Sequence, residues 1–381
     1  MFSTTTSVEN QEFVSEVPAE VRRGKVYLEA EADGLRSSFI LDTGSPTILT
    51  RAMADALGLE IRGQSTGVDA NGTPVTMDLA VLDRMQIGDV VFRDVPVFIL
   101  DEEESGAARC LFDGGVIGSE LMPLANWQID LERERVILAS RTDDLEHVAG
   151  AARADLVVSG YPFMPVVSHR INGSFADNAL FDTGNTELLH LNIRAFEQLR
   201  RQGLIDSVSA TASGVFGGSA GGQAETQEFF RVPLDRLSIG GLDLLDLEVW
   251  TRARVPSLIG AKLLQSHVVT LDYSGGNVYF SPFTEVAPDK PTFGFRPIID
   301  GRAVRVGFLR AGSSAEEAGL RLHDLIVQID GTDVSDVSPD EVCTVFDYLL
   351  SIQNRDRLRI EFQRDGEVWE VVVHKDPRAT R

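Results

Sequence analysis

Short runs of alternating hydrophobic and polar residues fill most of the chain up to about residue 280 and predict a fold built mainly of β-strands. Lys25–Ala32, Val75–Leu82 and Val90–Leu100 are rich in β-branched residues and are bounded by Gly, Asn and Asp. Helical periodicity is confined to brief stretches that end in Gly-Leu, such as Arg51–Leu59. The pattern therefore favours many short strands with few helices.

The same order of motifs occurs twice, which indicates an internal duplication. Phe39–Ser45 reads FILDTGS and returns 140 positions later as ALFDTGN at Ala179–Asn185. Four more blocks return in the same order: Arg51–Leu59 as Ile193–Leu204, Leu82–Gly88 as Leu234–Gly240, Gly115–Gly118 as Ser257–Gly260, and Trp127–Leu138 as Val269–Phe280. We therefore expect two similar β-lobes, over residues 21–150 and 151–282.

Polar, irregular segments flank the duplicated part. Residues 1–20 are polar and predict a poorly ordered lead-in. Residues 283–291 lie among Pro282, Pro288 and Pro291, which predicts a linker. A different pattern begins at residue 292 and indicates a further domain.

Composition and charge exclude several functions. The chain is 43% hydrophobic and 24% charged, which is typical of a globular protein with a hydrophobic core. Its net charge of −23 repels nucleic acid and anionic membranes, so we expect neither as a partner. No apolar run approaches the ~18 residues of a membrane span.

Cysteine and histidine usage argues against metal chemistry. Two cysteines, Cys110 and Cys343, are too few for a disulfide scaffold, an iron–sulfur cluster or a cysteine-based zinc site. We expect both to be unpaired, with Cys343 as a small buried residue of a helix. The six histidines are scattered singly, so we expect neither a metal nor a cofactor.

Unpaired cysteines and the lack of a visible signal peptide favour a cytoplasmic location, and a periplasmic or secreted one stays open if a leader was trimmed.

The Asp-Thr-Gly triplets at Asp42 and Asp182 are the strongest candidates for chemistry. One such triplet also suits an ordinary turn after a buried strand. Two triplets at matching places can bring two carboxylates together, and such a pair shares one proton. One carboxylate can then activate a water while the other protonates a carbonyl oxygen or a leaving amine. The loop residues expected to build this site are Thr43, Gly44, Ser45, Thr183, Gly184 and Asn185.

Residues 24–282 resemble the pepsin-like and retropepsin-like aspartic peptidases. The resemblance is carried by the two triplets and by an apolar-apolar-Gly segment after each, Val116–Gly118 and Leu258–Gly260. It implies a mainly β, bilobal, pseudo-two-fold aspartic-protease fold of the double retropepsin-like kind, with Asp42 and Asp182 as catalytic residues across a cleft. It also implies supporting positions beneath the loops at Ile117, Gly118, Ile259 and Gly260.

The resemblance further implies a flap hairpin over the cleft. The two candidates are Gly67–Pro74, with an Asn-Gly turn typical of hairpins, and the glycine-rich Gly214–Gly222. The second is interpreted either as a mobile lid or as a disordered insertion. The candidate flap contacts are Asn71, Gly72, Phe216 and Gly217. Neither segment has the tyrosine of pepsin flaps, and Asn185 stands where Ser, Thr or Ala is more usual, although Asn can still donate a hydrogen bond to the aspartate.

Residues 292–376 resemble PDZ domains of the bacterial protease-associated type, so we expect an α+β PDZ domain there. Ala311–Leu320 followed by Asp324–Gly331 carries the resemblance, and Ser338–Glu341 is a capping box that predicts a helix. The resemblance implies a groove in which a peptide C-terminus adds as a strand. Its implied contacts are Phe293, Gly294, Phe295, Val342 and Phe346. A domain docked permanently on the lobes, with its groove unused, is the alternative.

These patterns together predict an aspartic endopeptidase that acts on protein or peptide substrates. Its PDZ domain would recruit peptide C-termini or regulate access to the cleft. The alternative is a catalytically weak or inactive peptide-binding scaffold that acts through the PDZ groove. Residues 1–150 carry 12 basic and 27 acidic residues, a net charge of −15, which predicts a negative cleft wall that favours basic or neutral peptides. The oligomeric state is not indicated.

Overall fold

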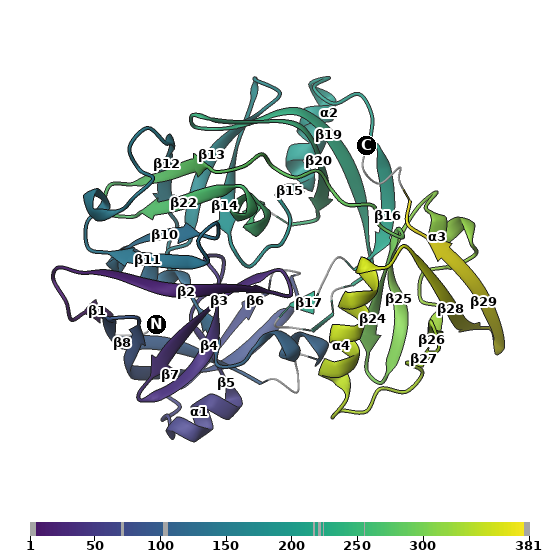
Figure 1. Cartoon of the computed structure of the whole chain (residues 1–381), viewed down its shortest axis with the longest axis horizontal. Helices are drawn as coiled ribbons and strands as arrows, with labels where there is room; N and C mark the ends of the chain where they lie inside the picture. The colour runs from purple at the N-terminus through teal and green to yellow at the C-terminus, as the bar shows by residue number, and fades with distance from the viewer. Residues whose placement is uncertain are drawn as a thin grey trace.

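The computed structural model describes residues 5–69, 72–101, 106–215, 225–254 and 256–376, together with the backbone of residues 218–219 and 222–223. The chain forms two β-rich lobes that lie against each other and a smaller module at one end (Figure 1). We call β1 to η3 the first lobe, β12 to β23 the second lobe, and β24 to β29 the C-terminal module.

The bounds of the elements follow the chain. The first lobe contains β1 (Ser7–Val8), β2 (Val14–Arg22), β3 (Lys25–Ala32), β4 (Leu35–Leu41), β5 (Ile48–Thr50), α1 (Arg51–Leu57), β6 (Gly63–Val68), β7 (Pro74–Ile87), β8 (Val90–Leu100), η1 (Gly106–Leu111), β9 (Gly115–Ile117), η2 (Ser119–Leu124), β10 (Asn126–Asp130), β11 (Arg135–Ala139) and η3 (Thr142–Asp144). The second lobe contains β12 (Ala152–Val158), β13 (Pro165–Ile171), β14 (Phe175–Asp182), β15 (Leu189–Asn192), α2 (Ile193–Arg201), β16 (Ala210–Gly214), β17 (Gly218–Ser219), β18 (Gly222–Gln223), β19 (Gln227–Ile239), β20 (Leu242–Arg252), β21 (Ser257–Gly260), η4 (Ala261–Gln265), β22 (His267–Asp272) and β23 (Asn277–Pro282). The C-terminal module contains β24 (Phe295–Asp300), β25 (Ala303–Arg310), α3 (Ser314–Glu317), β26 (Leu325–Ile329), β27 (Thr332–Asp333), α4 (Val342–Ser351), η5 (Ile352–Asn354), β28 (Arg357–Arg364) and β29 (Glu367–His374).

Both lobes have the same strand topology because the repeated sequence blocks form equivalent elements. In the first lobe β9 pairs in parallel with β4 and antiparallel with β5. In the second lobe β21 pairs in parallel with β14 and antiparallel with β15. β8 and β20 run parallel to β5 and β15, respectively. The predicted mainly β, bilobal, pseudo-two-fold fold is confirmed.

A six-stranded antiparallel sheet joins the two lobes, in the order β2-β11-β10-β22-β23-β12. At its centre Gln128 of β10 lies opposite Thr270 of β22, and the Gln128 amide donates to the Thr270 hydroxyl at 2.8 Å. The two residues occupy equivalent places in the duplicated sequence, so the pseudo-two-fold axis passes between them. One hydrophobic core continues through both lobes, and the side chain of Trp127 on β10 is fully buried in it.

The predicted disorder of residues 1–20 is wrong for much of that segment, because Val14–Arg22 forms β2. Along this strand Ser15, Val17 and Ala19 are buried while the residues between them are exposed. β2 pairs with β11 in the interlobe sheet and then with β3 in the first lobe. Its small residues at every second position form the buried face of a strand, although the composition of the segment is largely polar.

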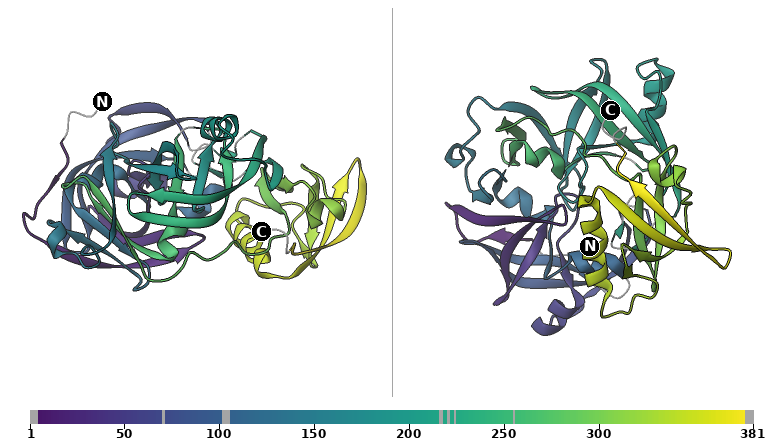
Figure 2. Two further views of the ribbon diagram at one scale, coloured as in Figure 1. Left: turned by 90° about the horizontal axis from the view of Figure 1, so that it is seen from above. Right: turned by 45° about the vertical axis from the view of Figure 1, so that its right-hand side comes forward.

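The C-terminal module has its own hydrophobic core but continues the sheet of the second lobe. β25 pairs with β24 and β26 inside the module, and its end pairs antiparallel with β16, so that Gly214 lies opposite Phe308. The amide of Val215 donates to the carbonyl of Gly307 at 2.8 Å. Figure 2 shows the module as a separate mass held against one end of the lobes. Within the described part of the chain, no helix has the length and apolar character needed to cross a membrane.

A disulfide joins the first lobe to the C-terminal module, so the prediction of two unpaired cysteines is wrong. Cys110 of η1 and Cys343 of α4 are 233 positions apart in sequence, and their Cα atoms lie 5.2 Å apart. Beside the disulfide, the guanidinium of Arg23 forms two hydrogen bonds of 2.7 Å with the carboxylate of Asp347 on α4. Cysteine spacing along the sequence carries no sign of this pairing, because only the docking of the module brings the two residues together.

Candidate active site

The two Asp-Thr-Gly loops follow equivalent buried strands, and each lies beside an apolar-apolar-Gly strand. Leu41, before Asp42, pairs with Ile117 of β9, and Asp182 pairs with Gly260 of β21. Each of these glycines packs under the loop with no room for a side chain. A Cβ on Gly118 would lie 2.1 Å from the carbonyl carbon of Pro46, and one on Gly260 would lie 2.2 Å from the Glu187 oxygen.

Four hydrogen bonds related by the pseudo-two-fold axis tie the two loops together. The amide of Thr43 donates to the Thr183 hydroxyl at 3.0 Å, and the amide of Thr183 donates to the Thr43 hydroxyl at 3.1 Å. The Thr183 hydroxyl donates to the carbonyl of Leu41 at 2.7 Å, and that of Thr43 donates to the carbonyl of Phe181. Both threonines are fully buried, so every one of these bonds is shielded from water. The lobes are thereby locked at the level of the aspartates.

The two carboxyl groups meet across the glycines of the loops. Each aspartate accepts the amide of its own glycine, Gly44 to Asp42 at 2.8 Å and Gly184 to Asp182 at 2.9 Å. A Cβ on Gly44 would lie 2.5 Å from the Asp182 carboxyl carbon, and one on Gly184 would lie 2.2 Å from a carboxyl oxygen of Asp42. Only glycine permits this close approach of the partner carboxyl group.

The electrostatics of the pair favour one shared proton. Burial, and then the neighbouring Asp42, raise the pKa of Asp182 to about 7. Lys25 and Arg252 act in the opposite direction and favour the ionised form of Asp182. Lys25 begins β3 of the first lobe and donates to the carbonyl of Gly184 in the second-lobe loop. The pair therefore keeps a proton into the neutral pH range, with two cations nearby.

The side chains of the residues after the two triplets form no hydrogen bond to the aspartate carboxyl groups in the described structure, although the amide of Asn185 donates to the carbonyl of Asp182 at 3.1 Å. The Ser45 hydroxyl donates to the carbonyl of Pro46 at 2.9 Å, and the Ser45 carbonyl accepts the amide of Ser119 at 2.8 Å. The Asn185 side-chain oxygen accepts the amide of Glu187 at 3.3 Å. The Asn185 side-chain nitrogen is buried and has no hydrogen-bond partner among the described residues, so no bond from it to an aspartate forms. Both residues shape the loops rather than the carboxyl pair.

A buried acid, Glu120, supports the first loop from below and was not expected from the sequence. The amide of Thr47 donates to the Glu120 carboxyl at 2.6 Å, and the amide of Gly118 donates to the Thr47 hydroxyl at 2.9 Å. Burial raises the pKa of Glu120 to about 7. Its position two residues after Gly118, where the second lobe has Lys262, is the only trace in the sequence.

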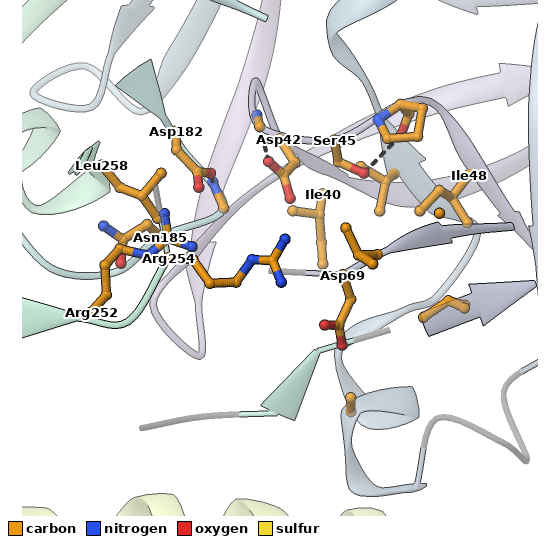
Figure 3. Close-up of a pocket in the computed structure, with 18 of the residues that line it drawn as sticks. Ile40, Asp42, Ser45, Ile48, Asp69, Asp182, Asn185, Arg252, Arg254 and Leu258 are labelled. Carbon is orange, nitrogen blue, oxygen red and sulfur yellow. Dashed lines mark hydrogen bonds between the residues drawn. The ribbon is translucent and has the colours of Figure 1, made fainter. Parts of the chain in front are cut away.

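A cleft of about 570 Å³ opens above the carboxyl pair (Figure 3). The first lobe lines it mainly with apolar side chains, among them Ile40, Ile48, Met77 and Phe98. The hairpin of β6 and β7 lines it with Gly67, Val68 and Val75, and the amide of Gly72 donates to the carbonyl of Asp69 between the two strands. This hairpin is the first flap candidate. Of the predicted flap contacts Gly72 has the positive φ of a turn, and Asn71 lies outside the described residues.

The second flap candidate lies between β16 and β19, which pair as a hairpin. Val215 of this candidate lines the cleft, as do Gln227 and Phe229 of the adjoining β19. Phe216 and Gly217, the predicted contacts there, lie outside the described residues. Because β16 also pairs with β25, this hairpin is bound to the C-terminal module. Tyr161, which lines the cleft from the loop between β12 and β13, was not expected from the sequence.

The charge of the cleft differs from the charge of the chain. Its described lining holds four cations and four acids: Lys25, Arg252, Arg254 and Arg296, against Asp42, Asp69, Asp182 and Glu225. The whole chain has 35 basic and 58 acidic residues. The described first-lobe lining holds one cation, Lys25, and two acids, Asp42 and Asp69, while exposed acids of that lobe such as Glu16, Glu20 and Glu29 lie outside the cleft.

The predicted peptide groove of the C-terminal module is covered. Phe293 and Phe295 are buried in the core of the module, with Val342 of α4 beside them and Phe346 half-buried. Gly294 has a positive φ, and its carbonyl accepts the amide of Arg310 at 2.8 Å. The segment η1 of the first lobe contacts both α4 and β24, and its Ala107 and Cys110 pack into the core of the module. The face between α4 and β24, where the peptide groove was predicted, is therefore in contact with η1.

Comparisons with known proteins agree with this geometry for the first lobe. Residues 28–121 match the model of the aspartyl protease family. The comparison with curated proteins found no match. Among solved structures, the chain is similar to the aspartic proteinase from Irpex lacteus, with 12% identity and a TM-score of 0.45, covering 71% of this chain and 97% of that one. It is also similar to basic 7S globulin from soybean, with 12% identity and a TM-score of 0.42, covering 71% of this chain and 95% of that one.

The family match spans both parts of the first-lobe site, the loop at Asp42 and the strand that ends before Gly118. The second lobe repeats the same strand pairing around Asp182. The sequence match and the strand register together support an aspartyl protease fold for the duplicated lobes.

Proposed function

We propose that the protein is an aspartic endopeptidase that hydrolyses peptide bonds with a water activated by Asp42 and Asp182. The observation that carries the proposal is the carboxyl pair itself. It lies at the floor of a cleft, on loops that are joined by the two-fold-related hydrogen bonds of Thr43 and Thr183. The raised pKa of Asp182 supports a pair that holds one proton and one negative charge near neutral pH.

The chemistry follows from that protonation state. The ionised carboxylate takes a proton from a water molecule while the oxygen of that water attacks the carbonyl carbon of the peptide. The protonated carboxyl group gives its proton to the carbonyl oxygen, which produces a tetrahedral diol. The diol then collapses: the carboxyl group that took the water proton gives it to the leaving nitrogen, the other carboxylate takes a proton from a diol hydroxyl, and the C–N bond breaks. The mirrored threonine bonds keep the two carboxyl groups in place throughout, so that little reorganisation is needed.

We further propose that the C-terminal module regulates access to the cleft rather than recruiting peptide C-termini through the α4–β24 face. Three contacts support this role: the β16–β25 pairing, the cover of the α4–β24 face by η1, and the disulfide between η1 and α4. η1 also faces the active site, since its Ala108 and Leu111 line the cleft. Movement of the module would therefore move one wall of the cleft.

The test of the endopeptidase proposal is cleavage of a diverse peptide library from about pH 3 to 8 by the wild type and by the Asp42→Asn and Asp182→Asn variants. We expect each substitution to lower kcat/KM by about 10²- to 10⁴-fold, because each removes one proton-transfer group. The exposed substitution Arg302→Gln, at a residue paired with Asp336 on the module, serves as the control. Cleavage that survives in both asparagine variants, or none by the wild type at any pH, would overturn the proposal.

A further inference from the structure

The two lobes offer different chemistry at equivalent positions of the cleft. Ile48 of β5 lies opposite Phe98 of β8, and His190 of β15 lies opposite Trp250 of β20. The parallel pairing is the same in both lobes, so Ile48 and His190 occupy the same place. Both line the cleft. An apolar side chain of the first lobe is thus replaced by an imidazole in the second.

The next equivalent pair shows a larger difference. Leu100 lies opposite Thr50 at the end of β8, and Arg252 lies opposite Asn192 at the end of β20. Leu100 is buried in an apolar cluster beside the first-lobe half of the cleft. Arg252 is half-buried and lines the second-lobe half, where its guanidinium donates to the carbonyl of Pro256 at 2.7 Å. The duplicated fold therefore places a guanidinium where its first copy has a leucine.

Two more arginines converge on the same half of the cleft. Arg254 follows Arg252 and extends into the space between the lobes (Figure 3). It reaches the first flap, where a Cβ on Gly72 would lie 2.1 Å from one of its guanidinium nitrogens. Arg296 comes from β24 of the C-terminal module and stacks over the ring of Phe308 at 5.3 Å. All three guanidinium groups that line the described cleft thus come from the second lobe or the module.

These cations lie close enough to influence one another and the acids beside them. Burial lowers the pKa of Arg252, and the adjacent Arg254 lowers it further, while Asp182 opposes the effect. Glu187 lies 3.5 Å from Arg296 and offsets part of the charge. Four cations against four acids line the cleft, and because the aspartate pair shares a proton, the lining is more positive than the rest of this acidic chain.

We propose that the second-lobe half of the cleft, formed by His190, Arg252 and Arg254, binds an acidic side chain of the substrate, while the first-lobe half around Ile48 binds an apolar one. The proposal rests on the proposed endopeptidase function and names its substrate class. A guanidinium recognises a carboxylate with two parallel hydrogen bonds, which neither an amide nor an ammonium group reproduces. The neutral imidazole of His190, whose pKa is lowered to about 3 by burial and the nearby Arg252 and Arg296, adds no competing charge.

A purely structural role for Arg254 predicts something different. If its contact with the Gly72 turn served only to hold the flap, its loss would slow cleavage of every peptide alike. A carboxylate-binding role changes the ratio between acidic and neutral substrates. The ratio is therefore the decisive measurement.

The experiment uses matched peptides that share one apolar residue and carry Glu, Gln or Lys at each position on the other side of the scissile bond. We expect the wild type to prefer Glu over Gln at one position by about tenfold to a hundredfold in kcat/KM. Arg254→Gln should bring that ratio close to 1, Arg254→Lys should restore part of it, and Arg254→Glu should favour Lys. The wild-type ratio should also fall as salt rises from about 0.05 M to 0.5 M. Arg302→Gln is the control and should leave the ratio unchanged.

The outcomes separate this proposal from the proposed function. Cleavage with equal rates for Glu and Gln at every position overturns the acidic subsite and leaves the endopeptidase in place. A lack of cleavage of all peptides overturns the endopeptidase, and the subsite is then judged by the affinity of the wild type for the Glu and Gln peptides, measured by fluorescence anisotropy. Equal affinities in that assay overturn the subsite as well.

Discussion

Glu120 shows how one residue couples the active-site loop to pH. Its carboxyl group is 4% exposed and holds the amide of Thr47, which in turn holds Gly118 beneath the loop of Asp42. Burial raises its pKa from 4.5 to about 7. The folded protein therefore keeps the Glu120 proton in a pH range where the unfolded chain has lost it. Stability contributed in this way is complete below about pH 4.5 and disappears as pH rises through about 7.

For Glu120→Gln we expect a smaller loss of unfolding free energy between pH 4.5 and 7 than for the wild type, by on the order of 3 kcal/mol. A glutamine oxygen can still accept the Thr47 amide but cannot ionise. Urea unfolding at the two pH values measures the difference. Glu132→Gln, at an exposed acid, is the control and should follow the wild type. Parallel losses in Glu120→Gln and the wild type would contradict the prediction.

At the same scale, sequence reasoning placed the Asp-Thr-Gly loops but missed the cations around them. Each triplet can be recognised from its own three residues. Arg252 can be recognised only when the two lobes are aligned, since the offset of 152 positions places it at the position of Leu100. Lys25 and Arg296 reach the site through tertiary docking, which no local pattern encodes.

Among the elements, the repeat predicted most strands because each lobe forms its own hydrogen-bond ladder. β3 and β8 have the predicted bounds, while β7 runs from Pro74 to Ile87, beyond the expected Leu82. β2 was missed because its buried face uses Ser and Ala beside Val, so alternation exists without strong hydrophobicity. The β16–β25 pairing was also not predicted, since the two strands belong to different units and their register depends on how these dock.

Phe308 lies where β25 of the C-terminal module meets β16 of the second lobe, a contact that we call the joint. It is 4% exposed on β25, and its ring lies 5.6 Å from that of Trp250 and 5.9 Å from that of Phe229, both from the second lobe. It also supports the guanidinium of Arg296. Phe308 thus contributes both to the packing of the joint and to the position of Arg296 in the cleft.

For Phe308→Ala we expect a loss of about 3–5 kcal/mol in unfolding free energy, because a buried aromatic ring is removed. We also expect a lower kcat/KM, because the second flap and Arg296 lose their support. The matched control is Phe362→Ala, which removes a ring 2% exposed in the core of the module. It should cost similar stability but retain kcat/KM below its melting temperature. An equal effect of both variants on kcat/KM would show that the joint has no special role.

Across the whole molecule, the disulfide and the Arg23–Asp347 pair hold the module against the first lobe. η1 is the shared piece, with one side in the core of the module and the other on the cleft. Disulfides of this kind persist in oxidising compartments, so cysteine usage no longer favours the cytoplasm. The match to the aspartyl protease family includes η1 with Cys110 but ends at residue 121, before the module that holds Cys343.

The double variant Cys110→Ser/Cys343→Ser tests that role. A cross-link that closes a loop of 233 residues limits the unfolded chain, so we expect a loss on the order of 5 kcal/mol in unfolding free energy. A reducing agent should destabilise the wild type to the same extent and leave the double variant unchanged. Urea unfolding with and without the reductant provides the measurement. A wild type that is insensitive to reduction would contradict the predicted role of the disulfide.

The position of the two cysteines also sets an order of events during biosynthesis. Cys110 leaves the ribosome 233 residues before Cys343, which is roughly 10 to 50 seconds at ordinary rates of translation. The wall of the cleft that contains η1 is therefore fixed only after α4 has been synthesised and Cys343 has formed its disulfide with Cys110. On the function proposed here, a nascent chain with both lobes complete would still lack its finished substrate site. The sequence separation of the two cysteines thus sets the earliest time at which the substrate site can be complete.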